Sequence, residues 1–548
     1  METQGARNTD LPTMALHWAV TVCLLVSILT GLRIAADSPD AQWAQALSGV
    51  LPQGDVIELH AWTALGLAFF SVAYLAFLWR TRLFSRIALD GTRLRALFFG
   101  TGAARRQAFN VSVYWLAFLG LSIAAITGVA LYFGPWALPY TALTDLHQVA
   151  AWGLVAYVFI HIAALLALGG MAHLLKIFKP RLAYGPAAAI ALVVGAGAAA
   201  AFWGMDRAST TRLTIAPLSQ APTLDGIGSD AVWDEANSVA IATHRGENLP
   251  DGEVTVTLRA GRYGDDFYSL FQWPDTTRSQ KHLPLVKTEA GWRVRQTEFG
   301  IQDEDAYYED KFGVMLATGG GLAGDGSIHM GAKPLDHKPG PSGGRGLHYT
   351  TDGGIVDVWH WKSVRTGNPV MNQIDDNFFG PPMKPKSKGR YTGGYSKDAK
   401  TGGGFVMNWE VYSDGIVTPK RLPRNPALAA RFQDVDLDPA QSDDVALFLP
   451  LHETVPYDSA LDTYPVGTIL PAVLVDAPFE GDRGDVSAYA RWADGLWTLE
   501  VRRKLDTGSA VDIAIKPGAP VYLWVAVFDH TQTRHSQHLH PIKLELEG

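Results

Sequence analysis

The chain has 548 residues and a formal net charge of −8, with 12 Lys and Arg against 8 Asp and Glu up to residue 205 and 34 against 46 after it. Neither half has the clustered basic stripes of a nucleic-acid-binding surface, so we expect no nucleic-acid partner. The single cysteine, Cys23, excludes internal disulfides, CxxC zinc sites, iron–sulfur ligation and covalent c-type haem, so any redox cofactor must be held by His, Met, Lys or carboxylate.

Five apolar segments are long enough to cross roughly 30 Å of hydrocarbon. They lie near residues 12–32, 57–79, 111–133, 146–169 and 185–204. The first could be a signal peptide, because "RIAADS" offers small residues for cleavage, but it is long and four more spans follow it. We therefore interpret it as a retained anchor. The expected fold is an α-helical transmembrane bundle of four helices over 1–183, with a fifth anchoring helix at 184–205.

The positions of the basic residues predict the orientation of these spans. Loop 80–106 contains seven arginines against a single acidic residue, Asp90, and the turn after the fourth span adds Lys176, Lys179 and Arg181. By the positive-inside rule both segments face the cytoplasm. We therefore expect a multi-pass protein of a bacterial inner (cytoplasmic) membrane, whose fifth span delivers everything after residue 205 to the periplasm.

Four histidines lie in these spans at two depths, although an imidazole in hydrocarbon is expensive. His17 is near the cytoplasmic start of the first span and His60 near the periplasmic start of the second. In the fourth span, His147 and His161 are separated by roughly 21 Å along the axis at 1.5 Å per residue. Depth therefore pairs His60 with His147 and His17 with His161, as two stacked bis-histidine b haems between facing helices require. A hydrogen bond to a neighbouring helix is the alternative role for any one of them.

Three short motifs in the spans carry a family resemblance. The segments "ALHW", "ELHAW" and "LHQVAAWGLVAYVFIHI" resemble the bacterial di-haem cytochrome b-561 family, which includes the cytochrome b subunits of nickel–iron hydrogenases. The resemblance covers residues 10–180. It implies that His17, His60, His147 and His161 are the axial ligands of two b haems, and that the protein exchanges electrons with quinone in the lipid bilayer.

The remainder of the chain has a different pattern. Residues 206–222 are polar and contain proline, which predicts a linker. Short alternating runs follow, such as "VTVTLRA", "VDVWHWK" and "VYLWVAVFD", and Gly-rich loops at 319–346 and 389–404 separate some of them. Many short strands without long helical periods predict an all-β sandwich domain over 223–548.

Four stretches of this half carry a second resemblance: "TLDGIGSDAVWDEA", "DDFYSLFQWPD", "HMG…DGGIVDVWHWKS" and "VYLWVAVFDH". They resemble the haem-binding subunit of ethylbenzene dehydrogenase and dimethyl sulfide dehydrogenase. The resemblance implies a third b haem, held in the sandwich by a methionine and a lysine. The methionine corresponds to Met330 in "IHMGA". The lysine has no clear counterpart, because Lys543 is the only lysine near the expected position, whereas four histidines crowd it: His530, His535, His538 and His540.

Strand alternation in "HLHPIKLELE" favours a histidine as the second ligand. Ile542, Leu544 and Leu546 share one face, so Lys543 points to water, and extending the alternation past Pro541 turns His538 and His540 inward. A lysine would also have to lose its proton to ligate iron. We predict Met330 and His538 as the ligands, with His540, His535 and His329 as alternates. Core filling by Met330 and adventitious metal binding by the terminal histidines are the competing interpretations.

These patterns predict a membrane-anchored b-type cytochrome that moves electrons between the quinone pool and a periplasmic redox protein, either a c-type cytochrome or a molybdenum enzyme. No nucleophile–base constellation or phosphate loop is found in the sequence, so no catalytic residue is assigned. Two alternatives lack the third haem: a ligand-binding module, since the sandwich also resembles sugar- or catechol-binding modules fused to di-haem cytochromes, and a docking module. The number of haems per chain separates them.

Overall fold

The structure is a computed structural model. It describes residues 9–36, 46–47, 49–134, 138–297, 304–319, 328–330, 346–383, 393–413, 416–433 and 435–547. The chain divides into two compact units. The first contains Met1–Ser209 with the segments Ile328–Leu347 and Lys388–Tyr391, and the second contains Thr210–Ser327, His348–Ser387 and Thr392–Gly548.

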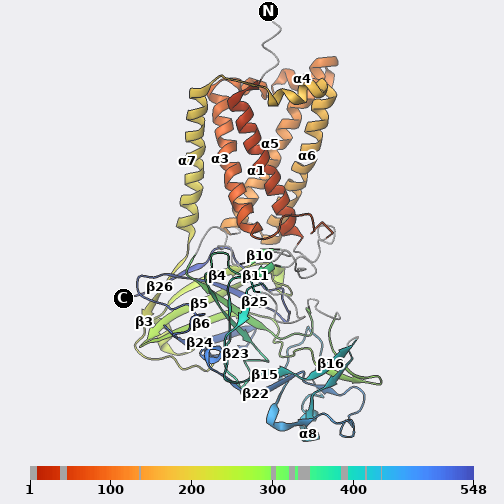
Figure 1. The fold of residues 1–548 in the computed structure, drawn as a ribbon, viewed down its shortest axis with the longest axis vertical. Helices are drawn as coiled ribbons and strands as arrows, with labels where there is room; N and C mark the ends of the chain where they lie inside the picture. Colours follow the sequence, from red (N-terminus) through yellow and green to blue (C-terminus); the bar gives the residue numbers. More distant parts are fainter. Residues whose placement is uncertain are drawn as a thin grey trace, which may run out of the picture. The chain divides into compact units, whose positions relative to one another are not determined.

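Five long apolar helices form most of the first unit: α1 (Leu11–Ala35), α3 (Val56–Arg80), α5 (Gly102–Phe133), α6 (Tyr140–Leu174) and α7 (Gly185–Ser209) (Figure 1). Each is long and apolar enough to cross a membrane, which confirms the five predicted spans. Large apolar side chains such as Phe159 and Val193 remain exposed, as lipid contact requires. The protein is therefore a multi-pass membrane protein.

Glycine permits the closest of the helix contacts. Helix α3 packs against both α1 and α7, and α5 packs against α6. A Cβ atom on Gly195 of α7 would lie 2.7 Å from the carbonyl oxygen of Phe69 in α3, so a side chain there would force the two helices apart.

The basic segments lie at one end of this bundle. The short strand β1 (Thr9–Asp10), just before α1, pairs with β2 (Pro180–Arg181), just after α6. The Asp10 carboxylate accepts a hydrogen bond from the Thr13 N–H at the start of α1 and forms an ion pair of 3.3 Å with Arg86. The start of α1, the Arg-rich loop and the basic turn after α6 therefore belong to the same end, where the helix α4 (Gly91–Phe99) also lies (Figure 1).

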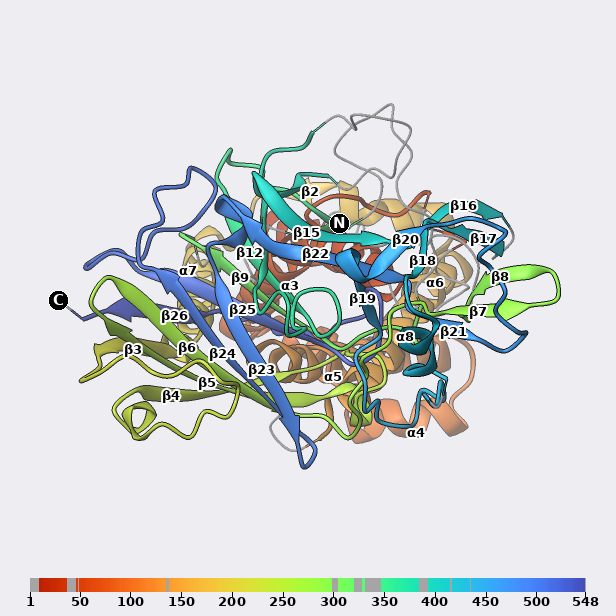
Figure 2. The ribbon, with the colours of Figure 1, turned by 90° about the horizontal axis from the view of Figure 1, so that it is seen from below.

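A curled sheet dominates the second unit (Figure 2). Eleven of its strands follow the order β14, β13, β12, β9, β25, β26, β3, β5, β6, β24, β23, and β4 pairs with β5 beside this path. Their bounds are β3 Arg212–Pro217, β4 Asn237–Thr243, β5 Val254–Tyr263, β6 Asp266–Pro274, β9 Lys311–Ala317, β12 Val356–Lys362, β13 Asp375–Phe379, β14 Tyr395–Lys397, β23 Ser487–Ala493, β24 Leu496–Lys504, β25 Val521–Phe528 and β26 Ile542–Leu546.

The two halves of this sheet face each other across one apolar core. Trp361 of β12 has its ring centroid 5.0 Å from that of Trp497 in β24 and 6.3 Å from that of Trp273 in β6. Strands distant in the sheet order therefore share a core, which confirms a β-rich, sandwich-like domain.

Smaller sheets complete the unit. Strands β15 (Gly402–Met407), β22 (Val473–Glu480) and β19 (Phe448–Pro450) form one sheet, and β16, β17, β8, β7 and β21 form another. The bounds of the second group are β7 Leu285–Thr288, β8 Gly291–Val294, β16 Trp409–Ser413, β17 Ile416–Pro419 and β21 Ile469–Leu470. Strand β18 (Arg421–Pro423) pairs with β20 (Thr454–Pro456), and α8 (Pro426–Ala430) follows β18.

The segment expected to be a linker, 206–222, differs from that expectation. Helix α7 continues to Ser209, and β3 begins at Arg212 and pairs in parallel with both β26 and β5. Leu213 and Ile215 are buried, so "RLTIAP" contains a half-buried strand with period-two alternation. Only residues 210 and 211 separate the helix from the sheet.

Candidate haem sites

His60 and His147 face each other between α3 and α6. Their ring centroids are 6.3 Å apart and the ring planes make an angle of 74°. Each Nδ1 lies close to a threonine hydroxyl on the neighbouring helix: Thr30 Oγ1 is 2.8 Å from His60 Nδ1, and Thr127 Oγ1 is 2.9 Å from His147 Nδ1. The two helix pairs, α1 with α3 and α5 with α6, thus supply the same arrangement twice.

The other contacts of the threonines decide the direction of these hydrogen bonds. Thr30 donates its hydroxyl hydrogen to the carbonyl oxygen of Val26 at 2.8 Å, and Thr127 donates its own to that of Ile123 at 2.7 Å. Each hydroxyl oxygen is then an acceptor, and the histidine Nδ1–H is the donor. This tautomer leaves the Nε2 lone pair of His60 and of His147 available to a metal ion.

His17 and His161 form the second pair, between α1 and α6. Their ring centroids are 6.5 Å apart at an angle of 52°. Aromatic rings surround His161: Tyr157 stacks on it at 5.4 Å and 22°, and the Tyr114 ring lies 5.5 Å away. The His161 Nδ1 atom is buried and has no hydrogen-bond partner among the described residues.

The spacing of both pairs fits a six-coordinate iron. Imidazoles on opposite sides of one metal ion have ring centroids about 6 Å apart, because each metal–nitrogen bond measures about 2.0 Å and the centroid lies roughly 1.1 Å beyond the nitrogen. A Cβ atom on Gly31 would lie 3.4 Å from His60 Cε1, and one on Gly128 would lie 3.3 Å from His147 Cε1. Glycine at each position therefore leaves room for the histidine ring. The residues present fit two bis-histidine haems.

Sequence reasoning identified the four histidines but missed Thr30 and Thr127. A signal was present, because the dipeptide Thr-Gly occurs at 30–31 in the first span and again at 127–128 in the third. A Thr-Gly dipeptide that recurs near the level of a histidine pair indicates residues that hydrogen-bond to the ligands of a metal.

His538, one of the two residues predicted to hold the third haem, is half-buried between two backbone partners. Its Nε2 accepts a hydrogen bond of 2.9 Å from the Val525 N–H, and its Nδ1 donates to the carbonyl oxygen of His540 at 2.7 Å. Burial lowers its pKa to about 4, so the ring is neutral. Strand β26 pairs with β25 only along Val521–Leu523, and His538 therefore serves the next free N–H of β25.

The other expected ligands of this haem are described less completely. Met330 and His329 belong to β10 (Ile328–Met330), which pairs with β11 (Gly346–His348), but their side chains lie outside the described part of the structure. His535 Nδ1 lies 2.8 Å from the carbonyl oxygen of Ser536. The expected alternation in β26 is confirmed, because Ile542 and Leu544 are buried while Lys543 forms an ion pair of 2.5 Å with Glu545.

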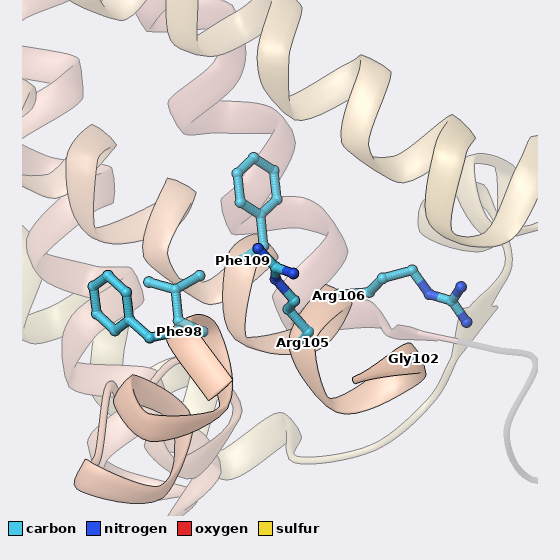
Figure 3. Close-up of a pocket in the computed structure, with 6 residues that line it drawn as sticks. Phe98, Gly102, Arg105, Arg106 and Phe109 are labelled. Atoms are coloured by element: carbon cyan, nitrogen blue, oxygen red, sulfur yellow. The ribbon is translucent and has the colours of Figure 1, made fainter. Parts of the chain in front are cut away.

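A surface recess of about 630 Å³ opens beside α4 and the first turns of α5 (Figure 3). It is lined by Leu97, Phe98, Gly102, Arg105, Arg106 and Phe109. Guanidinium groups beside aromatic rings suit a molecule with an apolar body and an anionic or hydrogen-bond-accepting head.

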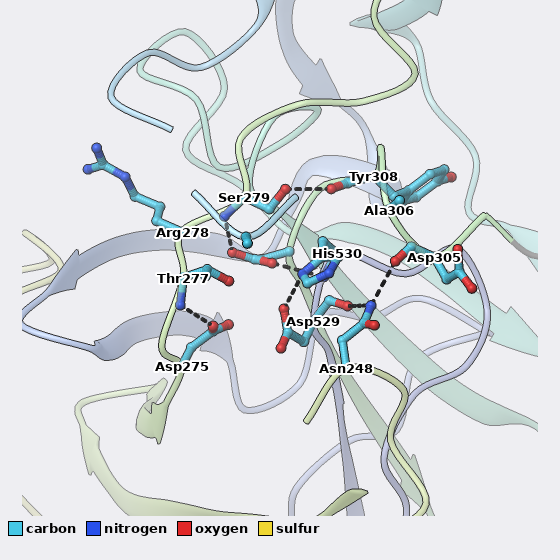
Figure 4. Close-up of polar contacts among 12 residues, drawn as sticks. Asn248, Asp275, Thr277, Arg278, Ser279, Asp305, Ala306, Tyr308, Asp529 and His530 are labelled. Carbon is cyan, nitrogen blue, oxygen red and sulfur yellow. Dashed lines mark hydrogen bonds and ion pairs between the residues drawn. The ribbon is translucent and has the colours of Figure 1, made fainter. Parts of the chain in front are cut away.

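The second unit contains a group of buried acidic residues whose oxygen atoms accept hydrogen bonds from neighbouring protein groups (Figure 4). Asp310, Asp529 and His530 place potential ligand atoms within 4.8 Å of one another. The Asp310 carboxylate accepts hydrogen bonds from the Ser279 N–H at 2.6 Å and the His530 N–H at 3.0 Å, and Asp529 pairs with His530 Nδ1 at 2.5 Å. Burial, followed by repulsion from Asp275 and Asp529, raises the pKa of Asp310 well above its usual range.

Comparison with known proteins identifies both halves of the chain. The family model for prokaryotic cytochrome b561 matches residues 8–179, and the model for ethylbenzene dehydrogenase matches residues 230–539. No curated protein matches the chain.

Solved structures similar to the chain are remote. A family 9 carbohydrate-binding module from Caldicellulosiruptor kristjanssonii, in complex with cellotriose, is 7% identical over 62% of this chain and 94% of its own, with a TM-score of 0.22. A protein from Bacteroides uniformis described as carbohydrate-binding is 6% identical over 62% of this chain and 100% of its own, with a TM-score of 0.26. Scores this low carry no argument about fold or ligand.

Proposed function

From its membership of the ethylbenzene dehydrogenase family and its N-terminal prokaryotic cytochrome b561 domain, we propose that this chain is an electron-transfer cytochrome, with b haems held by His60 with His147 and by His17 with His161. The cytochrome b561 family implies di-haem b. The observation that carries the residue assignment is the spacing of the two ring pairs, 6.3 and 6.5 Å, which leaves room for one iron in each.

The residues around each pair have distinct tasks in this proposal. Haem iron supplies one-electron redox chemistry when it is bound. The Nε2 atoms of His60 and His147 are presented as ligands because Thr30 and Thr127 hold the Nδ1–H groups. The rings of Tyr114 and Tyr157 exclude water from His161. Ligands that are held in place by packing and hydrogen bonds keep reorganisation small, which favours electron transfer over chemistry on a substrate.

We assign the end that carries β1, α4 and the basic turn to the cytoplasm, because cationic loops are retained on that side. The second unit is then periplasmic. A reporter that is active only in the cytoplasm should be silent when fused after Gly548, and should be active when inserted in loop 80–106. Strong activity from the fusion after Gly548 would reverse the orientation.

A third haem in the second unit, with Met330 and His538 as ligands, is part of the proposal. Family membership supports it. Ligation by His538 requires the Val525 N–H to exchange its present acceptor for another, at a cost of about 1 kcal/mol. The second candidate function, a ligand-binding or docking module without a third haem, is favoured by that same backbone hydrogen bond, which already gives His538 a structural role.

The exchange partners follow from this layout. Quinone in the bilayer is the proposed partner of the membrane haems, and a c-type cytochrome or a molybdenum enzyme is the proposed periplasmic partner. The recess lined by Phe98 and Arg105 combines apolar and cationic side chains, as protein segments that contact an anionic membrane surface do. It lies at the end of the bundle that is proposed to be cytoplasmic.

The number of haems per chain tests the proposal directly. Pyridine haemochrome quantification on purified full-length protein should give three b haems per chain. Two would leave the electron-transfer proposal intact and favour the docking or ligand-binding alternative for the second unit. Fewer than two would contradict the assignment of the histidine pairs.

A further inference from the structure

Five aspartates from separate segments of the second unit converge at one buried place. Asp357 is in β12 and Asp376 in β13; Asp398 follows β14; Asp485 follows the short turn η7 (Asp482–Gly484); and Asp512 lies between β24 and β25. Oxygen atoms of Asp357, Asp376 and Asp512 lie within 4.8 Å of one another. Asp357 and Asp376 are fully buried and Asp398 is 4% exposed, whereas Asp485 and Asp512 are half-buried. We call these five residues the Asp357 cluster.

Three of these carboxylates have one oxygen bound and the other without a partner. Asp357 Oδ2 accepts from Arg503 at 2.6 Å, Asp376 Oδ1 accepts from the Asn377 N–H at 3.0 Å, and Asp512 Oδ2 accepts from the Thr507 hydroxyl at 2.6 Å. The second oxygen of each is buried and has no hydrogen-bond partner among the described residues.

The remaining two aspartates extend this pattern. Neither Asp398 oxygen accepts from an N–H or other protein donor within the described part of the chain, and neither does Asp485 Oδ1; their polar neighbours are other carboxyl groups of the cluster, Asp512 beside Asp398 and Asp376 beside Asp485. Unpartnered buried carboxylate oxygens are costly, and six in one cluster indicate that a ligand is missing from the set of contacts.

The charges in the cluster are not balanced by protein cations. Arg503 is its single ion-pair partner among the described residues, against five carboxylates. Burial and then repulsion from Asp512 raise the pKa of Asp398 to about 8 and that of Asp485 to about 7.

The neighbouring residue on β13 shows the opposite situation. Asp375 points to the other face of the strand, where it pairs with Lys362 and, at 2.6 Å, with Arg483. There the cations outweigh the effect of burial and hold the pKa of Asp375 at about 2. The fold therefore supplies ion-pair partners to Asp375, whereas Asp376, one residue later, has no ion pair of its own among the described residues.

We propose that the Asp357 cluster binds a calcium ion. Calcium takes six to eight oxygen ligands at 2.3–2.6 Å, so ligands of one ion are at most about 5 Å apart, and the three carboxylate oxygens lie within 4.8 Å of one another. An all-carboxylate set lacks the nitrogen and sulfur ligands that zinc and copper prefer. Magnesium is bound by few carboxylates and keeps several waters, which a set of five converging aspartates disfavours.

The group formed by Asp310, Asp529 and His530 differs from the Asp357 cluster in its hydrogen-bond partners. Its carboxylates are served by backbone N–H groups and by His530, so we assign no ion to it. In the Asp357 cluster the ion would join segments between residues 357 and 512, which include β12, β13 and the connection between β24 and β25. The inference does not depend on the number of haems.

The test uses full-length protein in detergent, stripped with a chelator and dialysed against metal-free buffer. Added Ca²⁺ should bind at about one ion per chain by elemental analysis and should raise the thermal unfolding midpoint, whereas an equal concentration of Mg²⁺ should raise it much less. Absence of Ca²⁺ binding, or of any Ca²⁺-dependent rise in the midpoint, would overturn the proposal.

Variants show whether the bound ion is in this cluster. Asp376→Asn and Asp398→Asn should each weaken Ca²⁺ binding at least tenfold. Because each replaces a carboxyl group whose ionised form is disfavoured in the metal-free protein, the metal-free variants should unfold at or above the midpoint of the metal-free wild type, a result that misfolding does not produce. Asp476→Asn, an exposed residue of β22, is the matched control and should bind Ca²⁺ as the wild type does. Wild-type binding in both cluster variants would place the ion elsewhere and refute the assignment.

Discussion

The two histidine pairs of the helical unit have nearly the same spacing and very different surroundings. The rings of His60 and His147 are 6.3 Å apart and those of His17 and His161 are 6.5 Å apart. In the first pair each Nδ1–H is held by a threonine hydroxyl. In the second, His161 is enclosed by tyrosine rings, and its Nδ1 has no hydrogen-bond partner among the described residues.

This difference indicates that two features have two roles. The spacing of the rings would allow a haem to bind, and the groups around the rings would set its midpoint potential. Helix packing alone sets the distance between facing rings, and both pairs therefore offer room for iron. A hydrogen bond from Nδ1–H makes an imidazole a more basic ligand, which stabilises the oxidised metal. We therefore expect the threonines to lower the midpoint potential of the haem at His60 and His147, while the tyrosines act on the other haem through exclusion of water.

The largest expected effect is the loss of a whole haem from one pair. His147→Ala should remove the haem shared with His60, and His161→Ala should remove the haem shared with His17, because each variant keeps only one of the two imidazoles that would hold the group. Haem content should fall by one per chain in each case, and redox titration should show that the remaining haem differs between the two variants. If both variants lost the same haem, the pairing would be wrong.

The sequence predicts which histidines face each other, but it does not predict which residues hydrogen-bond to them. Depth along a helix follows from residue number, so the positions of His147 and His161 in α6 determine which partner each can reach. The contact between Thr30 and His60 depends on how α1 and α3 are rotated about their axes, which residue number does not determine. Hence the histidines were predictable, and the threonines were recognised only in the structure.

In the β-rich unit, the sequence predicts patterns within one strand, but it does not predict which residues from distant segments meet in the fold. Alternation correctly predicts that Ile542 and Leu544 are buried and that Lys543 is not. The same alternation in "RLTIAP" lies inside the segment predicted to be a linker, where the structure has β3. The aspartates of the Asp357 cluster come from five separate segments, and only the strand order brings Asp357 beside Asp376. Sequence spacing carries no information of that kind.

The next largest effect concerns the third haem. Met330→Ala should abolish a thioether-to-iron band near the red edge of the visible spectrum in the oxidised full-length protein, and His538→Ala should lower haem content by up to one per chain. The two membrane haems should remain, since their ligands are unchanged.

A control is needed because His538 also accepts a hydrogen bond from Val525. Ser536→Ala removes a comparable acceptor, that of the Val527 N–H at 3.1 Å, without removing a possible ligand, so it should keep the haem. Equal haem loss in both variants would make the role of His538 structural. An intact spectrum in His538→Ala together with its loss in Lys543→Ala would assign the second position to lysine.

The smallest effect tests the difference between the two pairs. Thr30→Val and Thr127→Val keep the shape of the side chain and remove the hydroxyl acceptor of the Nδ1–H, so that only the backbone carbonyl oxygens of Ser27 and Ala124 remain as partners of the two rings. The haem at His60 and His147 should remain bound, and its midpoint potential should rise, because a less basic imidazole stabilises the oxidised iron less. A tenfold change in the oxidation equilibrium corresponds to about 59 mV for a one-electron couple, and we expect a shift of about this size or less. The potential of the haem at His17 and His161 should stay within error of the wild type.

Thr30→Ser and Thr127→Ser retain the hydroxyl and should restore the wild-type potential. A shift of the wrong haem, or serine variants that behave as the valine variants do, would show that the threonines act through packing and not through the hydrogen bond.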